Sequence, residues 1–236
     1  MVVGTVFRVI LLKSRLYYDK INLIRNKGKR RVVCAVRVAF VLTLGAEHME
    51  HILKEKLEDC PVVAAVRDEK GLDQALDSEC GVIFILFGDL LNIEEVIRRV
   101  KEAGKLAMVH MDLIGGLGAK DVSVDFIRQN TKADGIITTK PQLIKHAKEV
   151  GLLTILRLFL LDSMAYENIG RQCAACHPDC IEVLPGVLPK VIRRICKQER
   201  TPVIAGGLMA DKEDIMTALQ AGAISVSATN PELWFL

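Results

Sequence analysis

Several side chains in the middle of the sequence have the chemistry to bind a hydroxylated ligand. His110 and Asp112 lie two residues apart in an apolar segment, so both point to the same face if that segment is a strand. A histidine and a carboxylate in this arrangement serve as a base and the group that orients it. Glu182 adds a carboxylate acceptor, and Arg157 adds a cation that binds an anion or pairs with an acid in the core. The alternative is a buried polar network that only fixes the interior of the fold.

Two short segments near the end of the sequence have the chemistry to bind phosphate. Gly206 and Gly207 have no Cβ, so their backbone N–H groups can approach an anion closely. Thr229 and Asn230 end a later apolar segment and add hydroxyl and amide donors. We therefore predict a phosphate site there, with Lys140 neutralising charge. The alternatives are a tight turn at the two glycines and a core ion pair for Lys140.

A cluster of metal-ligating side chains also occurs in this part of the sequence. Cys173, Cys176 and His177 form the pattern of c-type haem attachment, and Cys180 would complete a zinc set. The cluster joins the end of a predicted helix to the start of a strand, so four ligands would have to converge within a very short segment. Because the chain has seven cysteines, an odd count, we predict reduced structural thiols in a cytosolic protein and no bound metal.

The segments that must position these side chains alternate regularly after Met49. Eight short runs are apolar on both faces, as buried parallel strands are: Pro61–Val66, Gly81–Phe87, Lys105–Leu113, Ala133–Thr139, Leu152–Asp162, Asp179–Leu184, Pro202–Leu208 and Ala223–Thr229. Between them lie seven amphipathic segments of helical period: Leu72–Ser78, Ile93–Ala103, Val122–Asn130, Gln142–Val150, Met164–Cys176, Leu188–Gln198 and Lys212–Ala221. This alternation predicts an α/β fold, a compact TIM-like (β/α)8 barrel, with an open doubly wound sheet as the alternative.

The barrel must be short, because these segments span about 170 residues where about 250 are usual. We expect short loops and a rudimentary eighth helix, since only Pro231–Leu236 follows the last strand. The amphipathic stretch Glu50–Glu58 is expected to cover the gap beside the first strand. Asn92 and Asp211 precede acidic first turns and are predicted to cap their helices. Ligands of such barrels meet the carboxyl ends of the strands, where the candidate side chains lie.

Composition supports an ordinary folded chain of 236 residues, with 50% hydrophobic and 26% charged residues. This excludes a disordered, collagen-like or multispan membrane protein. Aromatic residues make up 5% of the chain, which disfavours a surface of stacked aromatics for single-stranded nucleic acid.

The first 48 residues differ sharply from the rest. They hold ten Lys and Arg against Asp19 and Glu47, a net charge of +8, whereas residues 49–236 hold 22 against 27, a net of −5. We expect this extension to be non-native or disordered, with translation starting at Met49 and residues 49–236 forming one barrel domain. A basic arm for RNA or anionic lipid and a late signal peptide are the alternatives.

The ends of the predicted strands are similar to those of a known family. The similar segments follow the same order as in that family: Val109–Ile114, Gly135–Lys140, Leu158–Ser163, Ile181–Gly186 and Pro202–Leu208, with Gly81–Leu86 and Asn230–Trp234 in addition. They resemble the glycerol uptake operon antiterminator regulatory proteins, also described as glycerol-3-phosphate-responsive antiterminators, over roughly residues 50–236. The resemblance implies a short barrel that senses glycerol 3-phosphate and needs no cofactor. It also implies that, with that ligand, the protein binds the leader mRNA of a glycerol-catabolism operon and prevents transcription termination.

The resemblance gives the candidate residues more definite roles. The phosphate candidates are Lys140, Gly206, Gly207, Thr229 and Asn230, and the polyol candidates are His110, Asp112, Arg157 and Glu182. The family has nothing like residues 1–48, which favours a start at Met49, and it does not require the cysteine cluster. It implies a cytoplasmic protein with no membrane partner and leaves a homo-oligomer open.

RNA contacts require cations, and the predicted helix Leu188–Gln198 offers the best group. Its four cations are spaced i, i+3, i+4 and i+7 on one face: Lys190, Arg193, Arg194 and Lys197. A lesser group comprises Arg98, Arg99 and Lys101. The alternative for each is a solvated helix face, so the RNA function rests on the resemblance.

An enzyme is the second hypothesis, because barrels host many activities on phosphorylated sugars and polyols. In that case His110 or Glu182 would carry the proton. A zinc or haem protein is the third.

Overall fold

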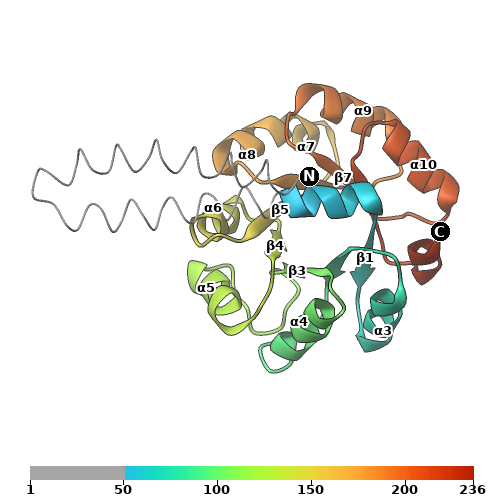
Figure 1. Ribbon diagram of the computed structural model, residues 1–236. Helices are drawn as coiled ribbons and strands as arrows, with labels where there is room; N and C mark the ends of the chain where they lie inside the picture. The colour runs from blue at the N-terminus through green and yellow to red at the C-terminus, as the bar shows by residue number, and fades with distance from the viewer. Residues whose placement is uncertain (1–50) are drawn as a thin grey trace, which may run out of the picture. The chain divides into compact units, whose positions relative to one another are not determined.

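A computed structural model describes residues 51–236, and the expected extension 1–48 lies outside this range. The chain divides into two units between Gly45 and Ala46, and the second contains the whole described region. Eight parallel strands close into a barrel in sequence order, with β8 pairing back onto β1 (Figure 1). The strands are β1 Val62–Val66, β2 Val82–Ile85, β3 Leu106–His110, β4 Gly135–Thr138, β5 Leu153–Phe159, β6 Cys180–Leu184, β7 Val203–Gly206 and β8 Ser225–Ala228. The predicted (β/α)8 barrel is confirmed, and the open sheet is excluded.

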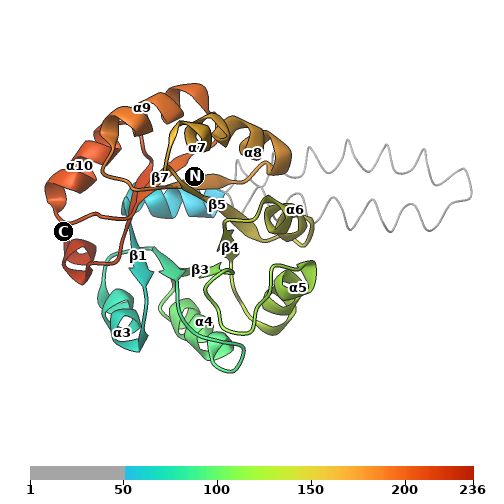
Figure 2. The same cartoon turned by 180° about the vertical axis from the view of Figure 1, so that it is seen from behind.

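Helices surround the barrel in both views (Figures 1 and 2). They are α3 Glu69–Asp77, α4 Ile93–Glu102, α5 Asp121–Asn130, α6 Pro141–Glu149, α7 Ser163–Glu167, α8 Ile169–Cys176, α9 Pro189–Gln198 and α10 Lys212–Gln220. The segment predicted as one helix over Met164–Cys176 is divided near Asn168 into α7 and α8. Every other predicted helix is present within a few residues of its expected bounds.

The helix caps follow the sequence only in part. Asp211 caps α10 as predicted, because its Oδ1 accepts a hydrogen bond from the Asp214 backbone N–H at 2.9 Å. Asn92 precedes α4 but makes no capping bond to it. Its Oδ1 instead accepts from the Asp89 backbone N–H at 2.8 Å and so fixes the turn that follows β2.

The eighth helix is reduced to one 3-10 turn, η1 Pro231–Phe235, as the short tail predicts. Trp234 in this turn is 2% exposed, and its indole N–H donates to the carbonyl of Ala228 at 2.9 Å. η1 lies against β1, β8 and α3, so it fills the space beside β1. The expectation that Glu50–Glu58 covers this gap is therefore wrong.

Residues 51–59 form a helix that closes the amino-terminal end of the barrel instead. Leu53 and Leu57 are each 2% exposed and belong to the same buried cluster as Val63, Phe84 and Met108 of three different strands. Figure 1 shows this helix, drawn in blue, lying across the strands. Leu53 and Leu57 therefore close the barrel interior at its amino-terminal end.

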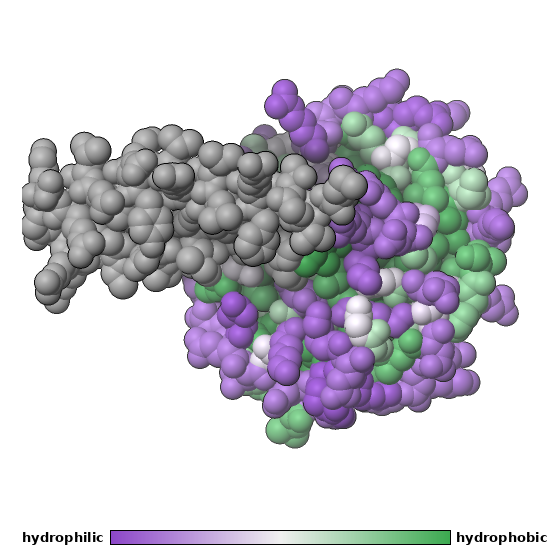
Figure 3. Space-filling model, viewed as in Figure 1, coloured by the Kyte–Doolittle hydropathy of each residue, from purple (hydrophilic) through white to green (hydrophobic). Residues whose placement is uncertain are grey.

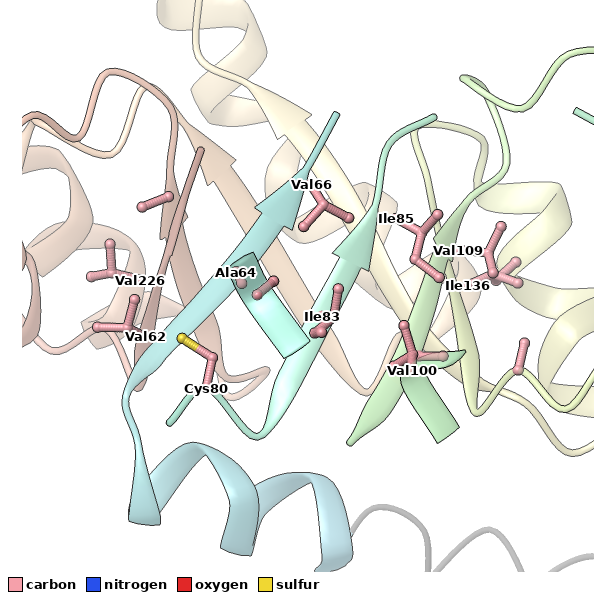
Figure 4. Close-up of a cluster of buried hydrophobic side chains, with 14 of the residues drawn as sticks. Val62, Ala64, Val66, Cys80, Ile83, Ile85, Val100, Val109, Ile136 and Val226 are labelled. Atoms are coloured by element: carbon pink, nitrogen blue, oxygen red, sulfur yellow. The ribbon is translucent and has the colours of Figure 1, made fainter. Parts of the chain in front are cut away.

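Each strand divides its side chains between two cores. On β1, Val62, Ala64 and Val66 belong to the large cluster that also contains the buried faces of the helices, and Figure 4 shows this layer. Val63 and Ala65 alternate with them and belong to the interior cluster. Both sets are apolar, which explains why the strand sequences are apolar on both faces.

The outer surface carries the polar residues. Figure 3 shows hydrophilic residues over most of the described surface on the face that carries the helix at 51–59, with apolar residues between them. Within residues 51–236, no helix has both the length and the apolar character needed to span a bilayer.

Candidate ligand-binding site

A pocket of about 410 Å³ opens at the carboxyl ends of β3, β4 and β5. Its size lies within the usual range for small-molecule sites. Four of the predicted ligand residues line it: His110, Asp112, Lys140 and Arg157. They come from the ends of β3, β4 and β5, and the pairing of these neighbouring strands brings them together.

His110, the last residue of β3, is the most unusual of the four. It is 2% exposed, and neither of its ring nitrogens has a hydrogen-bond partner within the described part of the chain. Burial lowers the pKa of His110 to about 4, and the nearby Arg157 guanidinium acts in the same direction. The ring is therefore neutral at pH 7, with one nitrogen donating and the other accepting. Buried polar groups are nearly always paired, so this ring is available to a bound ligand or water.

Asp112 lies at the mouth of the pocket and ties β3 to β4. It accepts hydrogen bonds from the Thr138 hydroxyl at 3.0 Å and from the Thr139 N–H and hydroxyl at 2.7 and 2.9 Å. Burial raises the pKa of Asp112, but these three hydrogen bonds outweigh it and hold the pKa below its ordinary value. The group is ionised and fixed in position, and a carboxylate accepts about four hydrogen bonds. Asp112 can therefore accept one further hydrogen bond, from a ligand hydroxyl.

Arg157 and Glu182 form a buried ion pair between β5 and β6. Arg157 Nε donates to Glu182 Oε2 at 2.5 Å, and the Ser227 hydroxyl donates to Oε1 at 2.6 Å. Glu182 is 1% exposed and Arg157 is 8% exposed. Arg157 thus combines the two predicted alternatives, because it pairs with an acid in the core and also lines the pocket. Both carboxylate oxygens of Glu182 are already engaged, so it lies behind the pocket wall.

The glycine pair after β7 lies elsewhere at the same end of the barrel. A Cβ on Gly206 would come within 2.6 Å of Glu182 Oε1, so glycine is required here by the buried ion pair. Gly207 has a φ of +76°, a left-handed conformation that favours glycine. The tight turn is therefore present, and it is compatible with the predicted approach of an anion.

The two polar residues after β8 differ in their contacts. Asn230 Oδ1 accepts from the Glu232 backbone N–H at 3.1 Å, and its Nδ2 lies 3.5 Å from the Ala210 carbonyl, so the amide joins the loops after β7 and β8. Thr229 is exposed. Neither residue lines the pocket over β3–β5.

The predicted phosphate group is thereby divided. Lys140 follows β4, which the strand order places across the barrel from β8. It lines the pocket with three of the four polyol candidates, whereas Gly206, Gly207, Thr229 and Asn230 lie on the other side of the barrel mouth. A small ligand can place its anionic group near one set or the other.

Sequence reasoning missed a glycine-rich loop that borders the pocket. Gly118 and Ala119, in the segment between β3 and α5, are part of the pocket lining. No atom of the described chain would lie within 4 Å of a Cβ on Gly118, so packing does not require glycine there. The detectable signal was the run Gly115-Gly-Leu-Gly118 directly after a strand.

The cysteine cluster is divided between two cores. Cys173 and Cys176 pack with the helices on the outside of the barrel, whereas Cys180 belongs to the interior cluster. His177 ends α8, where its backbone N–H donates to the Cys173 carbonyl at 2.7 Å. No three His, Cys, Asp or Glu side chains within residues 51–236 are grouped so that they could hold a metal ion.

The two groups of cations predicted for RNA differ in their surroundings. On α4, Arg98 pairs with Glu95 and Glu102, Arg99 with Glu69 and Asp73, and Lys101 with Asp134. On α9, all four cations are exposed, and none of them forms an ion pair with a described residue: Lys190, Arg193, Arg194 and Lys197. The α9 group therefore keeps its positive charge.

A closed eight-stranded barrel with a polar pocket at its carboxyl end defines a TIM-like barrel protein with a candidate ligand site. The sequence matches the family described as glycerol-3-phosphate responsive antiterminator over residues 62–234. The chain belongs to this family. The match places it among regulatory proteins rather than among the enzymes that share the fold.

Individual relatives agree with this assignment. The uncharacterised Escherichia coli protein YgcP is 43% identical over 186 residues, covering 79% of this chain and 95% of YgcP. The crystal structure of a glycerol uptake operon antiterminator regulatory protein from Listeria monocytogenes superposes with a TM-score of 0.72 at 31% identity, covering 75% of this chain and 95% of that one. The crystal structure of a glycerol uptake operon antiterminator-related protein from Thermotoga maritima superposes with a TM-score of 0.64 at 34% identity, covering 73% of this chain and 96% of that one.

Some enzymes share only the fold. Orotidine 5′-phosphate decarboxylase from Pyrococcus horikoshii has a TM-score of 0.54 at 20% identity, covering 71% of this chain and 88% of that one.

Proposed function

We propose that this protein binds glycerol 3-phosphate at the carboxyl end of its barrel and, in that state, binds leader mRNA of a glycerol-catabolism operon to prevent transcription termination. The family description supports the effector and the antitermination. The observation that carries the ligand site is His110, a buried ring with two unpartnered nitrogens at the wall of a pocket. The protein acts in the cytoplasm, where leader RNA is made, and needs no cofactor.

The pocket suits the hydroxyl end of the ligand. A neutral imidazole offers one donor and one acceptor, which matches a pair of neighbouring hydroxyls. Asp112 can accept one more hydrogen bond, and Arg157 contributes the remaining donors of its guanidinium. Glu182 acts indirectly, by holding Arg157 in place.

The phosphate has two candidate positions, and the loops after β7 and β8 are the better one. Gly207 has a left-handed backbone and no Cβ, so an anion can approach its N–H closely, and this region is where barrels of this fold commonly bind phosphate. Thr229 and Asn230 add polar groups from the next strand. Lys140 offers a point charge on the far side of the mouth.

The same loops connect the ligand to the RNA surface. The Gly186 backbone N–H donates to the Gly207 carbonyl at 3.2 Å, and Gly186 lies in the short connection from β6 to α9. A phosphate bound at Gly207 would thus lie beside the turn that leads into α9. The unpaired cations of α9 are the chemistry that RNA phosphates require. A homodimer would double this surface.

Calorimetry with glycerol 3-phosphate on the full chain tests the ligand site. Gly207→Asp places a carboxylate at the phosphate and is expected to abolish binding, whereas Gly207→Asn, of the same size but neutral, is expected to retain most of it. Lys140→Met is expected to weaken binding less than Gly207→Asp. If Lys140→Met abolishes binding and Gly207→Asp does not, the phosphate lies over β4.

Titration of a labelled glycerol-operon leader RNA, with and without glycerol 3-phosphate, tests the regulation. We expect tighter RNA binding when the ligand is present, because a ligand shifts an equilibrium only toward the state it binds better. Equal RNA affinity with and without saturating ligand would contradict the proposal.

A further inference from the structure

Two cysteines lie together at the amino-terminal end of the barrel, away from the ligand pocket. Cys60 lies two residues before β1, and Cys80 lies two residues before β2. These strands are parallel neighbours, and both cysteine side chains pack on the same buried cluster. Neighbouring strands are about 4.8 Å apart, and disulfides bridge Cα atoms about 4.4–6.8 Å apart. If the register that pairs Ala64 with Ile83 is continued to the segments before the strands, Cys60 and Cys80 are diagonal neighbours, one residue out of step, a separation that a disulfide can bridge.

The surroundings give the two thiols opposite properties. Interaction with the Cys80 thiol lowers the pKa of Cys60 to about 6, against the effect of burial. The same interaction and burial raise the pKa of Cys80. Lys105 stands beside the pair, where its ammonium donates to the carbonyls of Ser78 and Cys80 at 2.5 and 2.9 Å. The lowered pKa favours the thiolate form of Cys60, and the raised pKa favours the protonated form of Cys80.

Exposure adds to this asymmetry. Cys60 is partly exposed, whereas Cys80 is completely buried beside the Trp234 carbonyl. Cys196 is also partly exposed, but burial raises its pKa. Among the cysteines of residues 51–236, Cys60 alone combines a lowered pKa with access to solvent.

We propose that Cys60 and Cys80 form an oxidation site at which a peroxide converts the two thiols into an intramolecular disulfide. The Cys60 thiolate attacks one oxygen of hydrogen peroxide, the O–O bond breaks, and hydroxide leaves, so Cys60 becomes a sulfenic acid. The Cys80 sulfur then attacks the Cys60 sulfur and loses its proton, and the S–O bond breaks to release water. Two electrons pass from the dithiol to the peroxide, which ends as two water molecules.

Mass spectrometry of the full chain tests this site. After treatment with a few equivalents of hydrogen peroxide, alkylation and trypsin digestion, we expect peptide 57–67 linked to peptide 71–98, with the loss of two hydrogens. Cys80→Ser is expected to leave Cys60 as a sulfenic acid that dimedone traps. Cys196→Ser, the matched control, is expected to form the link as the unchanged chain does.

The alkylation rate of the reduced protein gives an independent measurement. Iodoacetamide is expected to modify Cys60 about tenfold faster than Cys196 at pH 7, because the thiolate is the nucleophile. Equal rates at the two cysteines would overturn the proposal. So would peroxide-treated protein in which either peptide links to a different cysteine in preference.

Discussion

The two ends of the barrel interior are built from opposite chemistry. At the amino-terminal end, Leu53 and Leu57 pack on an apolar interior that includes Phe84. At the carboxyl end, a few residues further along the same strands, the interior holds the Arg157–Glu182 ion pair and the unpartnered His110. One cylinder therefore contains a sealed apolar core and a buried polar site.

Burying polar groups in this way lowers the stability of the fold, so a role in binding is the reason to keep them. An apolar side chain gains free energy when it is buried, whereas a buried charge or unpaired polar atom costs free energy. Within the described chain, the Arg157–Glu182 pair and the unpartnered His110 ring lie at the end where barrels bind their ligands. We therefore expect the amino-terminal end of the barrel to determine stability alone. The carboxyl end should determine ligand affinity at the expense of stability.

Removal of Glu182 should have the largest effect. Glu182→Ala leaves the Arg157 guanidinium buried without its partner, so we expect a loss of about 3–5 kcal/mol in the free energy of unfolding. Urea unfolding measures this loss. The double variant Arg157→Met with Glu182→Met buries no charge and should recover most of the stability while losing affinity for glycerol 3-phosphate. A double variant that binds the ligand normally would show that the ion pair is structural only.

Leu57→Ala should affect stability alone. This substitution removes buried methyl groups from the helix that closes the amino-terminal end of the barrel. Such changes lower the free energy of unfolding by about 2–5 kcal/mol. Urea unfolding should show the loss, whereas calorimetry of the remaining folded protein should give an unchanged affinity for glycerol 3-phosphate. A loss of affinity comparable to that of the double variant above would mean that the two ends are coupled.

His110 should make the stability depend on pH. Its pKa in the folded protein, about 4, lies below the ordinary value of 6.5, so the unfolded chain binds a proton more readily. The stability that the neutral ring contributes is fully present above pH 6.5 and is lost as the pH falls toward 4. Between pH 7.5 and 4.5 the protein should lose about 2–3 kcal/mol more than His110→Leu does.

Urea unfolding of both proteins at the two pH values isolates this difference, because all other titrating groups are shared. His110→Leu should also be at least as stable at pH 7.5, since it removes two unpaired buried nitrogens. Parallel pH profiles for the two proteins would show that the ring has partners in solution.

The sequence was sufficient for the barrel because its strands are apolar on both faces and its amphipathic helical segments recur between them at regular spacing. It was not sufficient to predict where the helix at 51–59 packs, because the apolar face of an amphipathic helix can cover any apolar surface of the barrel. Leu53 and Leu57 cover the end of the cylinder, and Trp234 fills the gap beside β1.

The site was predictable as a set of strand ends but not as a set of contacts. Strand order determines that Lys140 and Asn230 lie across the barrel from each other, and single positions do not reveal that distance. The unpartnered state of His110 depends on what surrounds it in three dimensions.

A comparison of the cations on α9 with those on α4 should give the smallest of the expected effects, a change in RNA affinity that is confined to α9. α9 follows the connection next to the ligand end and keeps its cations unpaired, whereas the cations of α4 are neutralised by acidic neighbours. Arg193→Ala with Arg194→Ala should weaken leader RNA binding about tenfold and reduce the salt dependence of binding, because each released phosphate contact lowers the slope. The matched control, Arg98→Ala with Lys101→Ala, should change RNA affinity less than twofold. Titrations of RNA at two salt concentrations measure both effects, and an equal loss in the two double variants would mean that RNA binds through general charge and not through α9.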